Sequence, residues 1–254
     1  MQTDFPGDER EVFPGIHERR RFLSGSMATA LALAIMGTFR GRALAQAQSN
    51  AMVGAEKLAW DDFLKQALPV AQQLIARPEF SVDEYLYRIG SLATRLNEIP
   101  DSKLGPYTSV DKHVWFGPSF RGTPFFIIQW RMEPGAVLPA HNHPNASVCS
   151  LGYAGEVRLR NFEIVGEPPD YSSTKPFQVR ESRNEMIAKG RISTLSPTRD
   201  NIHCFQTGKE GARGIDINTL HGAMGPFRFL NISEKAMDLE KRIYEATWNA
   251  SLGQ

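Results

Sequence analysis

Short runs of β-branched and aromatic residues recur from about residue 106 to residue 232, and they restrict the fold more than any other feature of the chain. Gly and Pro residues separate the runs. Many short strands divided by turn residues at this spacing are typical of a β-sandwich or a jelly-roll barrel. We predict a mainly β sandwich or jelly-roll barrel with strands at 114–116, 125–132, 147–153, 157–164, 177–179, 192–195, 202–206, 215–220 and 227–232.

Two amphipathic segments precede the predicted strands. Residues 58–76 carry apolar side chains at helical spacing, which indicates a helix with one buried face. A second helix is expected to begin at Ser81, because Ser81 and Glu84 form the capping-box pattern, and to end before Pro100. We therefore predict that residues 48–105 form a helical segment packed on the barrel.

The tail of the chain is predicted to be a further helix. Residues 233–254 include Met237, Leu239, Ile243 and Tyr244, which are available to dock such a helix on the barrel. The expected domain order is thus a leader, a helical pair, a barrel over residues 106–232 and a C-terminal helix.

The first 47 residues are typical of an export signal. The string Arg19-Arg20-Arg21-Phe22-Leu23 precedes an uncharged run rich in Ala, Leu and Met, and it resembles a bacterial twin-arginine signal. Ala45-Gln46-Ala47 offers a small-x-small cleavage site. An uncleaved membrane anchor is the alternative, but the apolar run is short for a full span. We predict that residues 1–47 direct the protein to the twin-arginine export machinery and are then cleaved off, which leaves a periplasmic or secreted protein with no stable membrane association.

Charge and cysteine content exclude two classes of function. The net charge is +1 with no basic stripe, which gives no support for nucleic-acid binding. The chain has two cysteines, Cys149 and Cys204, which is too few for a disulfide framework or a cysteine-rich zinc site.

Two histidines one residue apart indicate a metal site. His141 and His143 lie between Gly135 and Gly155, and in an extended backbone the side chains of residues i and i+2 point to the same face. Imidazole suits iron, copper, nickel and zinc. Two solvated loop histidines are the alternative interpretation. The spacing resembles the first motif of the cupins, which are double-stranded β-helix barrels, except that Val148 stands where that motif usually has a glutamate ligand.

His203 is the candidate for a third ligand. It opens a predicted strand directly after a turn, where the second cupin motif places its histidine. Asp200 stands near the usual glycine of that turn, and aspartate tolerates the left-handed backbone better than most residues.

Together these motifs resemble the thiol dioxygenase family of plant cysteine oxidases and animal cysteamine dioxygenase, over roughly residues 106–220. Asp216 falls where that family has an aspartate near its metal, and we expect it to accept a hydrogen bond from a histidine ligand. The place of the family's tyrosine falls at Gly222, and the neighbouring His221 is the candidate replacement. Asp216 and His221 are therefore the predicted catalytic residues.

The resemblance implies a non-haem Fe(II) enzyme that adds both atoms of O₂ to the sulfur of a small cysteamine- or cysteine-like thiol, giving a sulfinic acid. Three neutral imidazoles would leave the charge of a ferrous ion uncompensated and so favour a thiolate. Arg131 and Arg158 are candidates for a substrate carboxylate, with solvated strand positions as the alternative. Two other functions stay open: a metal-dependent cupin with a non-thiol substrate (a dioxygenase or an isomerase using Mn, Ni or Zn), and a non-catalytic cupin that binds a metal or a small ligand.

Overall fold

The computed structural model describes residues 56–77, 81–101, 105–106, 113–223 and 225–249. The chain divides into two units, Met1–Arg40 and Gly41–Gln254, and the fold below is that of the second unit. The predicted leader and its cleavage site lie outside the described residues. No helix within the described ranges is long and apolar enough to cross a membrane.

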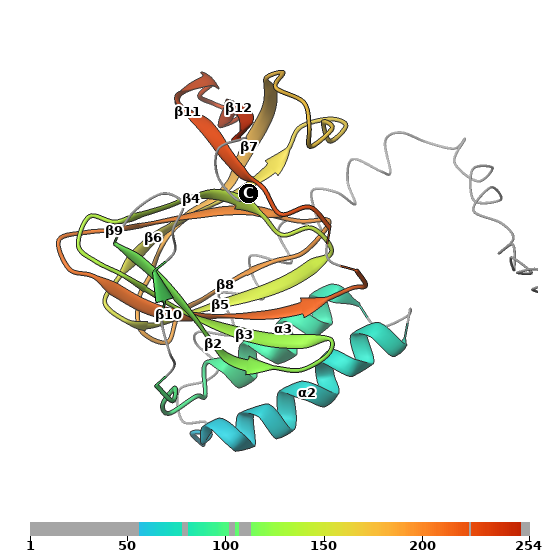
Figure 1. Ribbon diagram of the computed structural model, residues 1–254, viewed down its shortest axis with the longest axis vertical. Coiled ribbons are helices and arrows are strands. Elements are labelled where there is room, and N and C mark those ends of the chain that lie inside the picture. The colour runs from blue at the N-terminus through green and yellow to red at the C-terminus, as the bar shows by residue number, and fades with distance from the viewer. Residues whose placement is uncertain (1–55, 78–80, 102–104, 107–112, 224, 250–254) are drawn as a thin grey trace, which may run out of the picture. The chain divides into compact units, whose positions relative to one another are not determined.

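The mainly β fold is confirmed by two sheets that face each other (Figure 1). One is a six-stranded sheet with the order β1-β2-β3-β10-β5-β8, and the other is a ring of paired strands, β11-β12-β7-β6-β9-β4, that closes on itself. The six-stranded sheet consists of β1 (Gly105–Pro106), β2 (Val114–Arg121), β3 (Phe125–Met132), β10 (Ala212–Leu220), β5 (Ala146–Ala154) and β8 (Ile192–Leu195). The ring consists of β11 (Phe229–Asp238), β12 (Ile243–Asn249), β7 (Phe177–Ile187), β6 (Val157–Ile164), β9 (Ile202–Thr207) and β4 (Val137–Asn142).

An apolar core joins the two sheets. Trp130 and Met132 of β3 pack with residues of the ring such as Leu138, Leu159 and Phe205, and all five are almost fully buried. Burying a large apolar side chain contributes about 1.5–3 kcal/mol. Side chains of a strand alternate between faces, so this core takes every second residue of β3.

The helical pair is confirmed and covers the other face of the six-stranded sheet. Figure 1 shows α2 (Trp60–Ala76) and α3 (Val82–Ala93) on the side of the sheet away from β4, β6 and β9. The Oγ atom of Ser81 accepts a hydrogen bond from the Glu84 amide at 3.4 Å, as the capping pattern predicts. The alternate residues of the sheet pack against the helices, among them Phe125, Ile127, Cys149, Leu151, Ile215 and Ile217.

The predicted C-terminal helix is wrong. Residues 233–249 continue β11 and then form β12, with a turn at which Arg242 has a φ of 55°. Tyr244, Ala246 and Trp248 are buried at every second position, which is the strand period. The barrel therefore extends to Asn249 rather than ending at residue 232, because β12 pairs with β7 and β11 pairs with β4 to close the ring.

One buried polar contact fixes the helices to the sheet. The hydroxyl of Tyr85 in α3 is hydrogen-bonded to the hydroxyl of Thr219 in β10, and both side chains are fully buried. Burial raises the pKa of Tyr85, so the phenol stays protonated at neutral pH.

We predict that Tyr85→Phe and Thr219→Val each lower the free energy of unfolding by about 1–3 kcal/mol, because each leaves one buried hydroxyl unpaired. The double variant should lose less than the sum of the two, since no unpaired hydroxyl remains. Urea unfolding of the four proteins measures this coupling. Strictly additive losses would show that the two hydroxyls do not depend on each other.

Candidate metal centre

The pairing of β4 with β9 brings the predicted ligands together. His141 near the end of β4 lies opposite His203 near the start of β9, although they are 62 residues apart in the sequence. His143 follows directly after β4 and reaches the same point. The predicted set of three histidines therefore converges in space.

The backbone around the site is held by side-chain amides and by two left-handed turns. The Asn201 side chain donates to the His143 carbonyl at 3.0 Å and accepts from the His143 amide at 3.3 Å. Asn145 and Asp200 both have a φ of 56°, so Asp200 adopts the left-handed conformation that the sequence predicts for it. Both turns thereby fix the direction of the strand ends that carry the ligands.

The imidazole nitrogens are close enough to share one ion. The Nε2 atom of His203 lies 2.9 Å from the Nε2 atoms of both His141 and His143. Each of the three histidines has a ring nitrogen that lies within 4.8 Å of a ring nitrogen of the other two. Two imidazoles bound about 2.1 Å from a metal ion at right angles place their nitrogens about 3 Å apart, which fits these separations.

The protonation state of the histidines suits metal binding. The Nδ1 atom of His141 is 2.8 Å from the Pro139 carbonyl oxygen, to which it donates, so the Nε2 lone pair faces the other two rings. Burial lowers the pKa of His141 to about 4, and burial lowers the pKa of His143 and of His203 well below the usual range. All three rings are therefore neutral at pH 7 and can act as ligands.

Aromatic rings pack around the histidines. Phe227 and Phe229 lie 5.4 and 5.7 Å from the His141 ring, and Phe205 lies 4.6 Å from the His203 ring, between centroids. Phe227 comes from the segment that connects β10 to β11 and also approaches His143 at 6.4 Å. An apolar environment of this kind strengthens interactions between an ion and its partners.

Val148 supplies no ligand atom at the place of the usual glutamate. It is fully buried and packs with Ala146, Leu195 and Leu220 on the barrel side of the six-stranded sheet. Cys149 packs with the helices on the opposite face. Burial raises the pKa of the Cys149 thiol to about 12, so this group is neutral.

Asp216 is not placed as we expected. Its carboxylate accepts hydrogen bonds from Trp130 Nε1 at 3.2 Å and from the Ser150 hydroxyl, rather than from a histidine of the described chain. Desolvation by burial raises the pKa of Asp216 to about 6, although both hydrogen bonds act in the opposite direction. For His141, the Pro139 carbonyl oxygen accepts the hydrogen bond that we expected Asp216 to accept.

The structure pairs the His221 side chain with Ser147. The Nε2 atom of His221 lies 2.8 Å from Ser147 Oγ, and the His221 amide donates to the Asn145 carbonyl at 2.7 Å. Ser147 alternates with Val148 along β5 and so shares the helix-facing side with Cys149. Gly222, at the place of the family's tyrosine, has a φ of 142°, a conformation that disfavours a side chain. That His221 replaces this tyrosine stays a prediction.

Neither arginine suggested by the sequence reaches the site. Arg131 lies over the Trp115 ring at 4.8 Å, and Arg158 donates to Asn184 at 2.9 Å on the outside of the barrel. Sequence reasoning missed the Pro139 carbonyl, because a backbone acceptor has no residue signature. It also missed Phe227, because only the strand pairing brings the residues after β10 to the histidines.

The segment that carries the three histidines is similar in sequence to known proteins. The PCO_ADO family model matches residues 113–219, a segment that contains all three histidines and Asp216 but ends before His221. Plant cysteine oxidase 2 of Arabidopsis thaliana is 29% identical over 94 residues, which is 37% of this chain and 34% of that protein. A probable 2-aminoethanethiol dioxygenase of Dictyostelium discoideum is 24% identical over 169 residues, 59% of this chain and 74% of that protein. These matches support cupin thiol dioxygenases as the family that the barrel resembles.

Solved structures of related shape are more distant. The cupin domain of Schizosaccharomyces pombe Cnp3 is 14% identical with a TM-score of 0.35, over 48% of this chain and 72% of that one. A double-stranded β-helix protein of Klebsiella pneumoniae is 14% identical with a TM-score of 0.36, over 53% of this chain and all of that one. The assignment of a barrel fold rests on the strand pairing of the chain itself.

The pKa of Asp216 gives a pH-dependent effect on stability. Its value in the folded protein lies above the value in an unfolded chain, so the folded state binds the proton more tightly. This contribution is fully present below about pH 4 and is lost as the pH rises through about 6. We predict that Asp216→Asn makes the metal-free protein more stable than the wild type at pH 7.5, by up to about 3 kcal/mol, with little difference at pH 4.

Urea unfolding at the two pH values measures this effect. Asp101→Asn is the matched control, because Asp101 is fully exposed and the same substitution there should change stability by less than about 0.5 kcal/mol at both pH values. A loss of stability in Asp216→Asn at pH 7.5 would mean that the ionised carboxylate stabilises the fold.

Proposed function

We propose that the protein is a non-haem Fe(II) thiol dioxygenase that converts a small thiol into its sulfinic acid. The convergence of the Nε2 atoms of His141, His143 and His203 within the segment that matches the PCO_ADO family model carries this proposal. The names of the two relatives, a cysteine oxidase and a probable 2-aminoethanethiol dioxygenase, support a thiol as the substrate.

The neutral ligand set favours an anionic substrate atom. All three imidazoles are uncharged at pH 7, and Val148 adds no carboxylate. The residues present therefore do not offset the charge of a divalent ion, and a thiolate is the preferred fourth partner. The rings of Phe205, Phe227 and Phe229 make the surroundings of the histidines apolar, which strengthens this preference.

When bound, a ferrous ion would supply coordination positions for the thiolate and for O₂ and would allow electron transfer between them. The overall change is balanced without a further reductant, because RSH and O₂ together give RSO₂H. The protein's own contribution is to hold three neutral nitrogens close together, where they could bind the ion. The hydrogen bond from His141 Nδ1 to Pro139 and the Asn201 contacts to His143 keep these rings in place.

We propose further that the enzyme is exported by the twin-arginine route and acts in the periplasm or outside the cell. The Arg19-Arg20 string, the apolar run and the small-x-small site support this proposal. A free thiol is scarce in an oxidising compartment, so a small exported or environmental thiol is the expected substrate.

Replacing Arg19 and Arg20 with Lys should keep the full-length protein in the cytoplasm with residues 1–47 attached, because the paired arginines are the part of the signal that the export machinery reads. Cell fractionation and mass measurement of the N-terminus check this outcome. Unchanged export of the double variant would contradict the twin-arginine assignment.

The purified protein loaded with ferrous iron should consume one O₂ for each sulfinate formed from cysteamine, cysteine or 3-mercaptopropionate. An oxygen electrode and mass spectrometry of the product measure both quantities. His203→Ala should lose bound iron and turnover together, because two imidazoles remain where three are needed.

His113→Ala is the matched control, since His113 is exposed and its Nδ1 atom pairs with Glu133 at 2.6 Å. This variant should keep the iron content and the rate of the wild type. Iron retained by His203→Ala would show that the ligand set is wrong. Bound manganese, nickel or zinc with no sulfinate from any thiol would favour a different metal-dependent cupin.

A further inference from the structure

A cavity of about 470 Å³ opens at the end of the six-stranded sheet where β2 and β3 meet. Its volume falls in the range of pockets that hold drug-sized ligands, roughly 300–1,000 Å³. The cavity is lined mainly by apolar side chains, and Arg121 is the charged residue among its lining residues.

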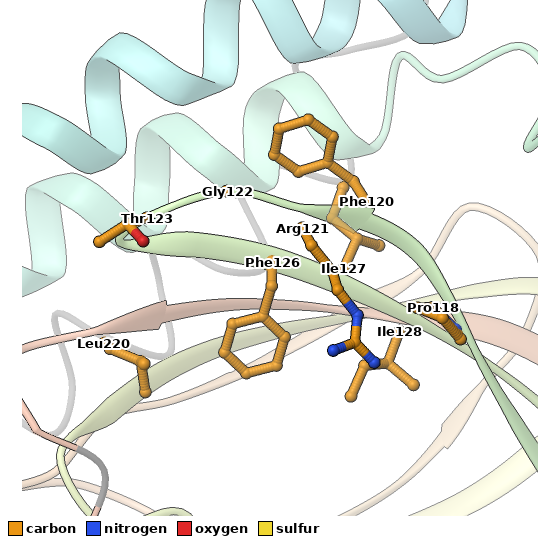
Figure 2. Close-up of a pocket in the computed structure, with 9 residues that line it drawn as sticks. All are labelled: Pro118, Phe120, Arg121, Gly122, Thr123, Phe126, Ile127, Ile128 and Leu220. Atoms are coloured by element: carbon orange, nitrogen blue, oxygen red, sulfur yellow. The ribbon is translucent and has the colours of Figure 1, made fainter.

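Phe126, Ile128 and Leu220 line this cavity from the barrel-facing side of the sheet, whereas Phe120 and Ile127, which also line it, pack against the helices. Phe126 and Ile128 alternate along β3 with Phe125 and Ile127, which pack on the helices, and they share their face with Trp130 of the barrel core. Figure 2 shows Phe126, Ile128 and Leu220 on the side of the sheet away from the helices.

The cavity lies at the same end of the barrel as the three histidines. Leu220, which lines it, is paired with Ala146 of β5, and the Ala146 amide donates to the His143 carbonyl at 3.3 Å. Leu220 also packs in the apolar cluster that contains Val148. An apolar surface thus continues from the cavity, past the position of the missing glutamate, to the turn that carries His143.

Arg121 is available to bind an anion. Its guanidinium points to the same side of the sheet as Phe126 and Leu220 (Figure 2). Within the described residues it makes no ion pair or hydrogen bond. A guanidinium offers several N–H donors in a plane that match the two oxygens of a carboxylate, and an apolar surrounding strengthens such a contact.

We propose that this cavity binds the distal end of the thiol substrate and that Arg121 recognises a carboxylate there. The inference rests on the proposed thiol dioxygenase function and specifies its substrate class. The substrate is then a thiol acid in which an apolar chain, longer than that of cysteine, separates the sulfur at the three histidines from a carboxylate at Arg121. The sulfur is oxidised as in the parent reaction, and the carboxylate is unchanged.

Two measurements test this inference, and one of them does not depend on metal chemistry. Octanoate, which has no thiol, should bind the purified protein in calorimetry, and Arg121→Gln should weaken that binding about tenfold or more because a charge-assisted hydrogen bond is lost. Arg121→Lys should recover part of the affinity. Arg158→Gln is the matched control, because Arg158 is an exposed strand arginine on the outside of the barrel, and it should bind octanoate as the wild type does.

In turnover, ω-mercaptooctanoate should have a higher kcat/KM than ω-mercaptooctanol, and Arg121→Gln should remove this difference while the rate with cysteamine is unchanged. If no thiol is oxidised but octanoate binding depends on Arg121, the proposed function fails, whereas carboxylate binding by Arg121 in the cavity stands. If cysteamine is oxidised but octanoate binds equally to the wild type and to Arg121→Gln, or to neither, the cavity assignment is wrong.

Discussion

The antiparallel pairing of β4 with β9 is the contact on which the rest of the site depends. It sets His141 opposite His203, and the turn after β4 then directs His143 to the same point. The pairing is held in register by the closed ring of strands, in which β11 pairs with β4 at Phe229 and His141. A shift of β4 by one residue in its pairing would turn the histidines to the other face. The geometry of the candidate ligands therefore depends on the register that barrel closure sets.

The two faces of the six-stranded sheet pack against different parts of the fold, because side chains alternate between the faces along each strand. Side chains such as Cys149 and Ile217 bury the helical pair, whereas Val148 and Asp216 face the barrel. The same alternation places Ser147, the hydrogen-bond partner of His221, on the helix-facing side.

The site combines a neutral ligand set with apolar surroundings. Three uncharged imidazoles, Val148 in place of an acid, and the neighbouring phenylalanines would leave the charge of a divalent ion to be balanced by the proposed thiolate. Apolar side chains also link this site to the cavity that Arg121 lines, through Leu220 and Val148. The proposed chemistry and the proposed substrate selection both use this apolar part of the barrel interior.

Local sequence patterns were sufficient to predict much of the secondary structure of this protein. The bounds of β3, β6 and β8, the cap at Ser81 and the left-handed Asp200 follow from residue type and spacing, because each depends on neighbours within a few positions. The motifs also identified the three candidate histidines, but the pairing of β4 with β9 brings them together. The tertiary structure decided the rest. The tail forms β11 and β12 rather than a helix because β4 and β7 offer strand edges to it. The acceptor for His141, the position of Asp216 and the cavity at Arg121 likewise arise from contacts between distant segments, and such contacts leave no local pattern in the sequence.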